Sequence, residues 1–151
     1  MVAKVRSCIR VVLATRQPSP RVQAVRAGAA LLDRAAELVR PHRTDVILEL
    51  ESAWAQGELD VHAAIEMAEA LTERAEAAGD HSGATLARAM ALLGRNYAGE
   101  PDATDEVIAI CRAALPLEEE RGDPRRLALL WEMLASAADF PPSAATMRLS
   151  A

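Results

Sequence analysis

The sequence predicts an all-α fold, and three observations lead to this class. The apolar fraction is 51% but the aromatic fraction is only 3%, so Ala and Leu, both strong helix formers, supply most of the apolar surface. Val, Ile, Thr and Tyr never gather into an alternating run between turn residues, so no strand is indicated. Breaks containing Gly or Pro divide the chain at intervals that suit helices. With 151 residues, the chain has the size of one domain.

Each helix is expected between two consecutive breaks. In chain order, the breaks lie at residues 18–20, 41, 57, 79–80, 99–101, 122–124 and 141–142. In the same order, the expected helices cover residues 21–39, 44–55, 61–78, 83–97, 103–121 and 125–138. Pro116 falls inside the fifth helix, which it is expected to kink or restart because it removes a backbone donor and clashes with the preceding turn.

Charge is unevenly distributed along the chain. Residues 1–32 carry six of the 17 basic residues and no acidic one, which leaves 11 basic against 22 acidic residues in the remainder. Such an acidic body repels phosphate backbones and anionic lipid, so we expect neither nucleic acid nor a membrane as its partner. Residues 1–20 lack interleaved aromatics and are assigned to a basic, irregular arm. Residues 21–140 form the helical domain, and 141–151 a disordered tail.

Cysteine usage indicates a reducing compartment. Cys8 and Cys111 are the only cysteines, which is too few for a disulfide framework, and they lack the paired spacing of a zinc site. The apolar stretch at 8–14 is too short for a transmembrane span and is not followed by a convincing cleavage site. We therefore expect a cytoplasmic protein.

The breaks recur in the sequence. Gly57-Glu58 returns as Gly99-Glu100, and Gly79-Asp80 returns as Gly122-Asp123, at offsets of 42 and 43. Aligning the segments between them gives three matched sets with the same internal spacing. The sets are Ile47, Leu50, Glu51 and Trp54; Met90, Leu93, Gly94 and Tyr97; and Trp131, Leu134, Ala135 and Ala138.

This spacing has a physical reason. The first, fourth and eighth positions of a set lie on one helix stripe, where large side chains fill the seam with a neighbouring helix. The fifth position is often small so that this neighbour can approach closely. Gly94 and Ala135 meet that requirement, whereas Glu51 does not.

The second set resembles the first-helix pattern W-x2-L-G-x2-Y of tetratricopeptide repeats. The second-helix pattern of small, large and small residues is found at Ala63, Met67 and Ala70, less closely at Val107, Cys111 and Ala114, and partially at Ala29, Asp33, Ala36 and Pro41. The period of about 42 exceeds the 34 residues of the family, which implies longer helices or loops. The resemblance covers roughly residues 21–138. It implies antiparallel helix pairs stacked as a short right-handed superhelix, an α-α solenoid.

A further similarity concerns large actinobacterial regulators. The extended period, the Gly-Asp breaks and the phrase Leu-Leu-Asp-Arg-Ala-Ala-Glu-Leu-Val at 31–39 are similar to the carboxy-terminal repeat regions of those proteins. There the resemblance implies an adenylate or guanylate cyclase-like domain, or a transcription-activator domain, joined through an ATPase domain to helical repeats. We recognise no such upstream domain in this sequence, and expect a fragment or a relative of the repeat region.

The resemblance also implies a concave groove built by the first helix of each pair. Residues two before, five after and nine after the first position of each set face that groove. They are Asp45, Ser52, Gln56, Arg88, Arg95 and Ser136. This polar mixture suits a protein or peptide partner, recognised as an extended segment or a helix.

The amino end of the array is expected to be uncapped. Residues 21–41 resemble the second helix of a repeat, but Arg16, Gln17 and Pro20 occupy positions where its first helix requires Leu, a small residue and Tyr. A severed array exposes an apolar face, because terminal repeats normally carry a polar cap. We therefore predict self-association or a homodimer through this end.

No catalytic or cofactor-binding pattern is found, and we expect no catalytic residue, metal or cofactor. His42, His62 and His81 lack a second ligand at helical spacing and are interpreted as solvated. The acidic residues Glu66, Glu69, Glu73 and Glu76 are interpreted as a charged outer face. The run Glu118, Glu119 and Glu120 is interpreted as a solvated helix end. Trp54, Tyr97 and Trp131 are assigned to core packing rather than to a ligand-stacking site.

The leading hypothesis is a non-catalytic protein–protein or domain–domain interaction module. One alternative is the remnant of a DNA-binding regulator or cyclase whose effector domains are missing. A second, less favoured alternative is a small helical enzyme, which would need convergent polar groups in a closed pocket.

Overall fold

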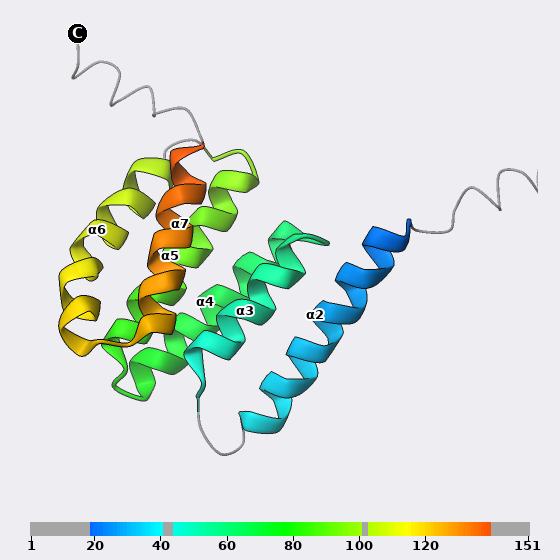
Figure 1. Ribbon diagram of the computed structural model, residues 1–151, viewed down its shortest axis with the longest axis horizontal. Coiled ribbons are helices and arrows are strands. Elements are labelled where there is room, and N and C mark those ends of the chain that lie inside the picture. The colour runs from blue at the N-terminus through cyan, green and yellow to red at the C-terminus, as the bar shows by residue number, and fades with distance from the viewer. Residues whose placement is uncertain (1–18, 41–43, 101–102, 140–151) are drawn as a thin grey trace, which may run out of the picture.

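The computed structural model describes residues 19–40, 44–100 and 103–139. The regular structure within these ranges is entirely α-helical, which confirms the all-α class. The helices are α2 (Pro20–Val39), α3 (Val46–Gly57), α4 (Val61–Ala77), α5 (His81–Tyr97), α6 (Ala103–Arg121) and α7 (Pro124–Ala138) (Figure 1). Their ends lie close to the boundaries expected from the Gly and Pro breaks. The predicted tail and the predicted arm up to residue 18 lie outside the described residues.

Aspartate starts most of these helices. The carboxylates of Asp45, Asp60, Asp80 and Asp123 accept hydrogen bonds from backbone N–H groups of the first turn, at 2.8 to 3.4 Å. Each satisfies a donor that the helix itself leaves unpaired. Ser19 does the same for α2, at 3.4 Å from the nitrogen of Val22.

Glycine sits just beyond three helix ends. Gly79, Gly99 and Gly122 have φ angles of 75°, 99° and 70°, the left-handed conformation that a side chain disfavours. Gly79 and Gly122 are followed directly by the N-cap aspartates of the next helices, which explains the recurring Gly-Asp pair. Gly57 is not equivalent to Gly99, because it is the last residue of α3 and lacks a positive φ. The 42-residue recurrence of Gly-Glu is therefore coincidental in structural terms.

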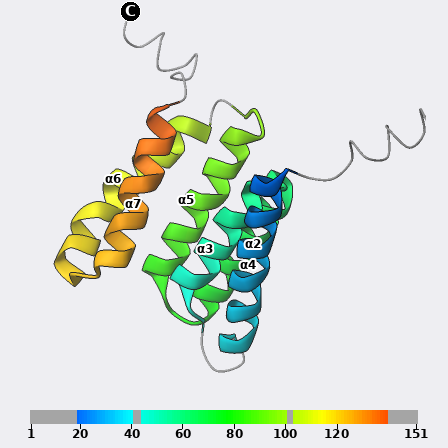
Figure 2. The ribbon, with the colours of Figure 1, turned by 45° about the vertical axis from the view of Figure 1, so that its right-hand side comes forward.

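The helices follow one another in space as they do along the chain. Each packs against the next, α3 also contacts α5, and α5 also contacts α7. Figures 1 and 2 show α2 at one end of this succession and α6 with α7 at the other. The central helix α5 buries more residues than any other described helix.

Helices α4 and α5 share the most extensive contact of any two helices described, and they run antiparallel. Arg88 of α5 pairs with Glu76 of α4 at 3.0 Å. Arg95, about two turns later in α5, pairs with Glu69, about two turns earlier in α4. Small residues bring the backbones together. A Cβ on Gly94 would lie 2.7 Å from Cγ1 of Ile65, so only glycine fits at this contact. The sequence pattern predicts a small residue at position 94, and the close contact with Ile65 is the reason for it.

The first two predicted stripes lie largely inside. Ile47, Leu50, Met90 and Leu93 are buried, and Trp54 packs half-buried against the core. Tyr97 differs, because it is 54% exposed at the last residue of α5. The eighth position of this stripe therefore lies at the surface and not in the seam between the helices.

The third stripe was predicted in the wrong register. Trp131 is 57% exposed, Ala135 is exposed and Leu134 is half-buried, whereas Leu130, Met133 and Ala137 are buried. The N-caps supply the correct alignment. Met133 follows Asp123 at the same interval as Met90 follows Asp80, so Met133, not Trp131, is the counterpart of Met90. A shift of two residues turns a helix position by about 200°, from the core to solvent.

Helix α4 shows a smaller error. Ala63 and Met67 are half-buried and Ala70 is exposed, while Ala64, Ala68, Leu71 and Ala75 are buried. The buried face of α4 lies next to the predicted one, because α5 packs against it there. In α6, by contrast, Val107, Cys111 and Ala114 are all buried.

Pro116 does not restart α6. The helix is continuous from Ala103 to Arg121 with the proline inside it, and Figure 1 shows its path curved. Proline removes one hydrogen bond but leaves the helix able to bend around it. The exposed position of Pro116 lets solvent satisfy the freed carbonyl.

Candidate functional site

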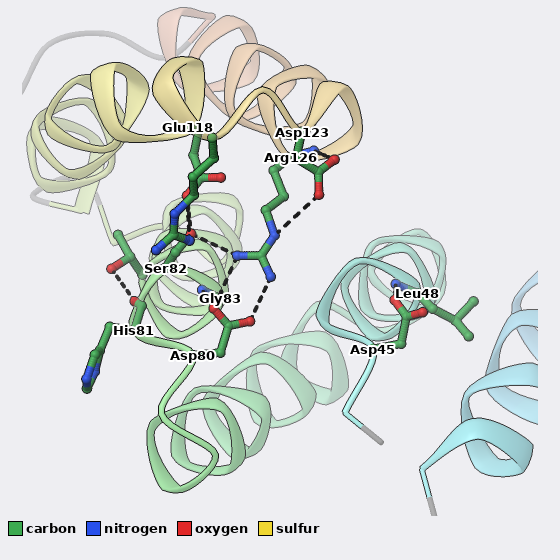
Figure 3. Close-up of polar contacts among 11 residues, drawn as sticks. Asp45, Leu48, Asp80, His81, Ser82, Gly83, Glu118, Asp123 and Arg126 are labelled. Atoms are coloured by element: carbon green, nitrogen blue, oxygen red, sulfur yellow. Dashed lines mark hydrogen bonds and ion pairs between the residues drawn. The ribbon is translucent and has the colours of Figure 1, made fainter. Parts of the chain in front are cut away.

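A polar network joins the beginnings of α5 and α7 to the end of α6. Arg126 forms two hydrogen bonds with Asp80, from Nη1 to Oδ1 at 3.2 Å and from Nη2 to Oδ2 at 2.7 Å (Figure 3). Its Nη1 also donates to the hydroxyl of Ser82 at 2.8 Å, and its Nε lies 3.8 Å from Asp123. Two parallel bonds to one carboxylate fix both position and orientation. We call these residues, with Glu118, the Arg126 network.

Glu118 is the buried end of this network. Its side chain is 2% exposed, it accepts a hydrogen bond from Ser82, and it lies 3.5 Å from Arg121. Its Oε2 has no hydrogen-bond partner among the described residues. The prediction of a solvated helix end therefore fails for Glu118, whereas Glu119 and Glu120 are exposed as expected. The fold turns this carboxylate inward because α5 packs across the end of α6.

The network controls the ionisation of Asp80. Hydrogen bonding to Arg126 is the main cause that holds the pKa of Asp80 below its usual value, and burial opposes it. The same bond raises the pKa of Arg126. Both groups are thereby held in their charged forms, which suits a structural clamp.

A second polar cluster lies between α2, α3 and α4. Glu49 is 6% exposed and its Oε2 is bound by Arg40 at 3.3 Å and by Arg74. These residues line a cavity of about 430 Å³ together with Ser52, Asp33 and Met67. We call it the Glu49 pocket. Oε1 of Glu49 and Nε of Arg74 have no hydrogen-bond partner within the described ranges. The two guanidinium groups tie α2 and α4 to one buried carboxylate of α3.

An apolar pocket opens between the ends of α3 and α5 and the start of α4. Its volume is about 370 Å³, and its lining includes Trp54, Tyr97, Met90, Leu93, Gly94 and Glu58. We call it the aromatic pocket. Met90 and Leu93 are buried, Trp54 is half-buried, and Tyr97 is more than half exposed at the rim. An apolar hollow with aromatic walls and one carboxylate resembles the anchor sites by which proteins hold single side chains.

The predicted groove residues do not converge on one site. Asp45 caps α3, Arg88 and Arg95 pair with acids of α4, and Gln56 and Ser136 are half-buried on α3 and α7. Ser52 is 2% exposed and lines the Glu49 pocket, and neither of the two pockets is lined by the other five.

The remaining predictions concern the acidic residues of α4, the histidines, metal binding and membrane spans. Glu69 and Glu76 are neutralised by arginines of α5, so the acidic side of α4 is partly paired. His62 and His81 are exposed, and His42 falls outside the described residues. Across residues 19–40, 44–100 and 103–139, no three His, Cys, Asp or Glu side chains are grouped to hold a metal ion. None of the helices described here is both long and apolar enough to cross a bilayer.

No family model, curated protein or solved structure matches the chain.

Sequence reasoning missed Glu49, Arg74, Ser82 and Arg126. A signal existed for Glu49, because it stands among Val46, Leu50 and Ala53 at the spacing of a buried helix face. An acid at such a position needs a buried cationic partner. Nothing in the sequence indicates that this partner comes from Arg74, 25 residues later.

Proposed function

We propose that the chain is a tetratricopeptide-like helical repeat module without catalytic activity, and that it binds a protein partner by holding one of its apolar side chains in the aromatic pocket. The aromatic pocket is the observation that carries this proposal. It is apolar inside, open at the surface, and walled by Trp54 and Tyr97. Tyr and Trp are the residues that most often dominate protein interfaces.

The packing order supports the repeat interpretation. Helix α5 contacts α3 on one side and α7 on the other, while α4 and α6 lie between them in the chain. Such contacts between alternate helices are what stacked helix pairs produce. The matched intervals from Asp80 to Met90 and from Asp123 to Met133 give two of these helices the same plan.

Charge defines the partner more closely. Glu58 lines the aromatic pocket, and the chain beyond residue 32 has twice as many acidic as basic residues. A partner segment with an apolar anchor next to Lys or Arg therefore fits this surface best. The expected occupant is a short peptide or helix of that composition.

The proposal is tested with a displayed peptide library selected on the full chain, followed by calorimetry with the enriched peptides. Tyr97→Ala removes one wall of the pocket at an exposed position. Gly57→Leu fills the pocket, because a Cβ on Gly57 meets only Ala64, at an ordinary 3.6 Å. Both variants are expected to weaken binding at least tenfold.

Trp131→Ala is the matched control, since it removes an equally exposed aromatic side chain from α7. It is expected to leave the affinity unchanged. Peptides that bind the wild type, Tyr97→Ala and Gly57→Leu equally well would show that the pocket is not the site. The absence of any enriched peptide with an apolar anchor would also reject the proposal.

A further inference from the structure

The Glu49 pocket contains two buried polar atoms of opposite character. Glu49 is 6% exposed, and both of its ion pairs use the same oxygen, Oε2, which Arg40 meets at 3.3 Å and Arg74 also binds. Oε1 of Glu49, an acceptor, and Nε of Arg74, a donor, have no hydrogen-bond partner among the described residues. A buried polar atom without a partner costs free energy that a bound group recovers. The pocket therefore suits a ligand that both donates and accepts.

The opening of the Glu49 pocket is acidic. Asp33 of α2 and Glu66 of α4 belong to its lining and are exposed, whereas Glu49 lies at its buried end. In total, three carboxylates and the two guanidinium groups line the pocket, which leaves one negative charge in excess. This excess disfavours an anionic ligand and favours a ligand that carries an additional cation.

We propose that the Glu49 pocket binds a small molecule with the chemistry of a free basic amino acid, such as arginine or lysine. Its ammonium group donates to Oε1 of Glu49, and its carboxylate accepts from Nε of Arg74. The cation of its side chain lies at the opening, near the two exposed carboxylates. A cavity of about 430 Å³ lies within the usual range of small-molecule sites.

The walls of the pocket agree with such a ligand. Ala63, Met67 and Ala70 of α4 provide apolar surface in the lining, against which the aliphatic part of a basic side chain packs. A metal ion fits less well, because within the described residues no three His, Cys, Asp or Glu side chains are grouped to bind one.

This ligand site is separate from the aromatic pocket. The two cavities share no lining residue, so the inference does not rest on the proposed binding of a protein partner. The lining of the Glu49 pocket comes from α2, α3 and α4, which lie together in the ribbon views (Figures 1 and 2). A bound amino acid would therefore join α2 to α4 through the buried carboxylate of α3.

Calorimetry on the full chain tests the ligand chemistry. L-Arginine is expected to bind saturably at millimolar concentrations or below. L-Citrulline, which lacks the side-chain charge, and N-acetylarginine, which lacks the ammonium group, should each bind about tenfold more weakly, because each loses a charged contact. No saturable binding of arginine or lysine, or equal affinity for all of these compounds, would overturn the proposal.

Argininamide distinguishes a free amino acid from the amino end of a peptide. It keeps the ammonium group and the side chain of arginine but replaces the carboxylate by a neutral amide. We expect it to bind about tenfold more weakly than arginine, because a charged acceptor bonds Arg74 more strongly than a neutral one. Equal affinity for argininamide would overturn the assignment to a free amino acid.

A variant that fills the pocket tests its position without altering any charge. Ala70 is exposed and belongs to the lining, so Ala70→Phe should narrow the cavity, leave the fold intact and weaken arginine binding about tenfold. Ala77→Phe is the matched control, since Ala77 is an exposed alanine of α4 outside the lining. Arginine affinity that is unchanged in Ala70→Phe, or that falls equally in both variants, would refute the proposal.

The role of the buried carboxylate has its own test. Glu49→Gln keeps the size of the side chain but removes its charge, and it is expected to abolish arginine binding at concentrations that saturate the wild type. Circular dichroism verifies that the variant is folded. Glu76→Gln is the control, because it removes a carboxylate that pairs with Arg88 on the surface, away from the pocket. A folded Glu49→Gln protein that binds arginine as the wild type does would refute the assigned contact.

Discussion

The guanidinium of Arg126 in α7 donates two parallel hydrogen bonds to the carboxylate of Asp80, one of 3.2 Å and one of 2.7 Å. Asp80 also caps α5, where it accepts from the nitrogen of Gly83 at 2.8 Å. The carboxylate of Asp80 therefore caps α5 and also binds α7, the last helix described. Because the two bonds come from residues 46 apart, they form only when the chain has folded.

The first prediction follows from this pair. Asp80→Asn keeps a good N-cap but removes the charge, so we expect a loss of about 1–2 kcal/mol in the free energy of unfolding at pH 7. Urea unfolding followed by circular dichroism measures it. Asp60→Asn at the exposed N-cap of α4 is the control and should cost less than half as much.

The pH dependence has a definite sign. The pKa of Asp80 is lowered in the folded protein, so its stabilising effect is present above the unfolded-state pKa of about 3.9 and is lost as pH falls through the folded value. The difference in stability between the wild type and Asp80→Asn should therefore shrink when unfolding is measured at pH 3 instead of pH 7. A difference that grows on acidification would contradict the role assigned to this carboxylate.

A second prediction concerns the contact between α4 and α5. Gly94→Ala is expected to destabilise the protein by about 1–2 kcal/mol, because the new Cβ would lie 2.7 Å from Cγ1 of Ile65. Gly28→Ala in α2 is the control. Nothing lies within 4 Å of its Cβ, so the helix propensity of alanine should stabilise by about 0.5–1 kcal/mol.

A double-mutant cycle locates the cause. In the background of Ile65→Ala, which removes the clashing Cγ1, the cost of Gly94→Ala should largely vanish. Thermal or urea unfolding of the four proteins measures the coupling. Additive costs would mean that the clash is not with Ile65.

The third prediction concerns Cys111. Burial raises the pKa of its thiol to about 11, so almost none of it is thiolate at neutral pH. In a Cys8→Ser variant, labelling by a thiol reagent at pH 7 should be slow in the folded protein and rapid in 6 M urea. Fast labelling without denaturant would show that α6 opens readily at this position.

The fourth prediction separates the two candidate registers of α7. Met133 is 0% exposed and Trp131 is 57% exposed. Met133→Ala should therefore cost about 2–4 kcal/mol, and Trp131→Ala within about 0.5 kcal/mol. Urea unfolding measures both. A larger loss from Trp131→Ala would restore the register expected from the sequence pattern.

The features of the fold that the sequence alone determined depend on chemistry within a few neighbouring residues. Ala and Leu content set the helical class. The glycines at 79, 99 and 122, together with the aspartates that cap α5 and α7, fixed where helices end and begin. These preferences act within a few residues, so they can be recognised without knowing the neighbours. The helix boundaries, the buried Leu50, Met90 and Leu93, and the small residue at 94 were accordingly within reach of the sequence.

Tertiary structure decided the rest. Which face of α7 is buried depended on how α5 and α6 approach it, and a two-residue error of register moved Trp131 from the predicted core to the surface. The pairing of Glu49 with Arg74 and of Asp80 with Arg126 joins residues 25 and 46 positions apart, and the aromatic pocket needs three helices at once. Such features arise from packing between segments that are distant in the chain. A sequence pattern records which residues prefer burial, but the approach of neighbouring helices decides which of them meet.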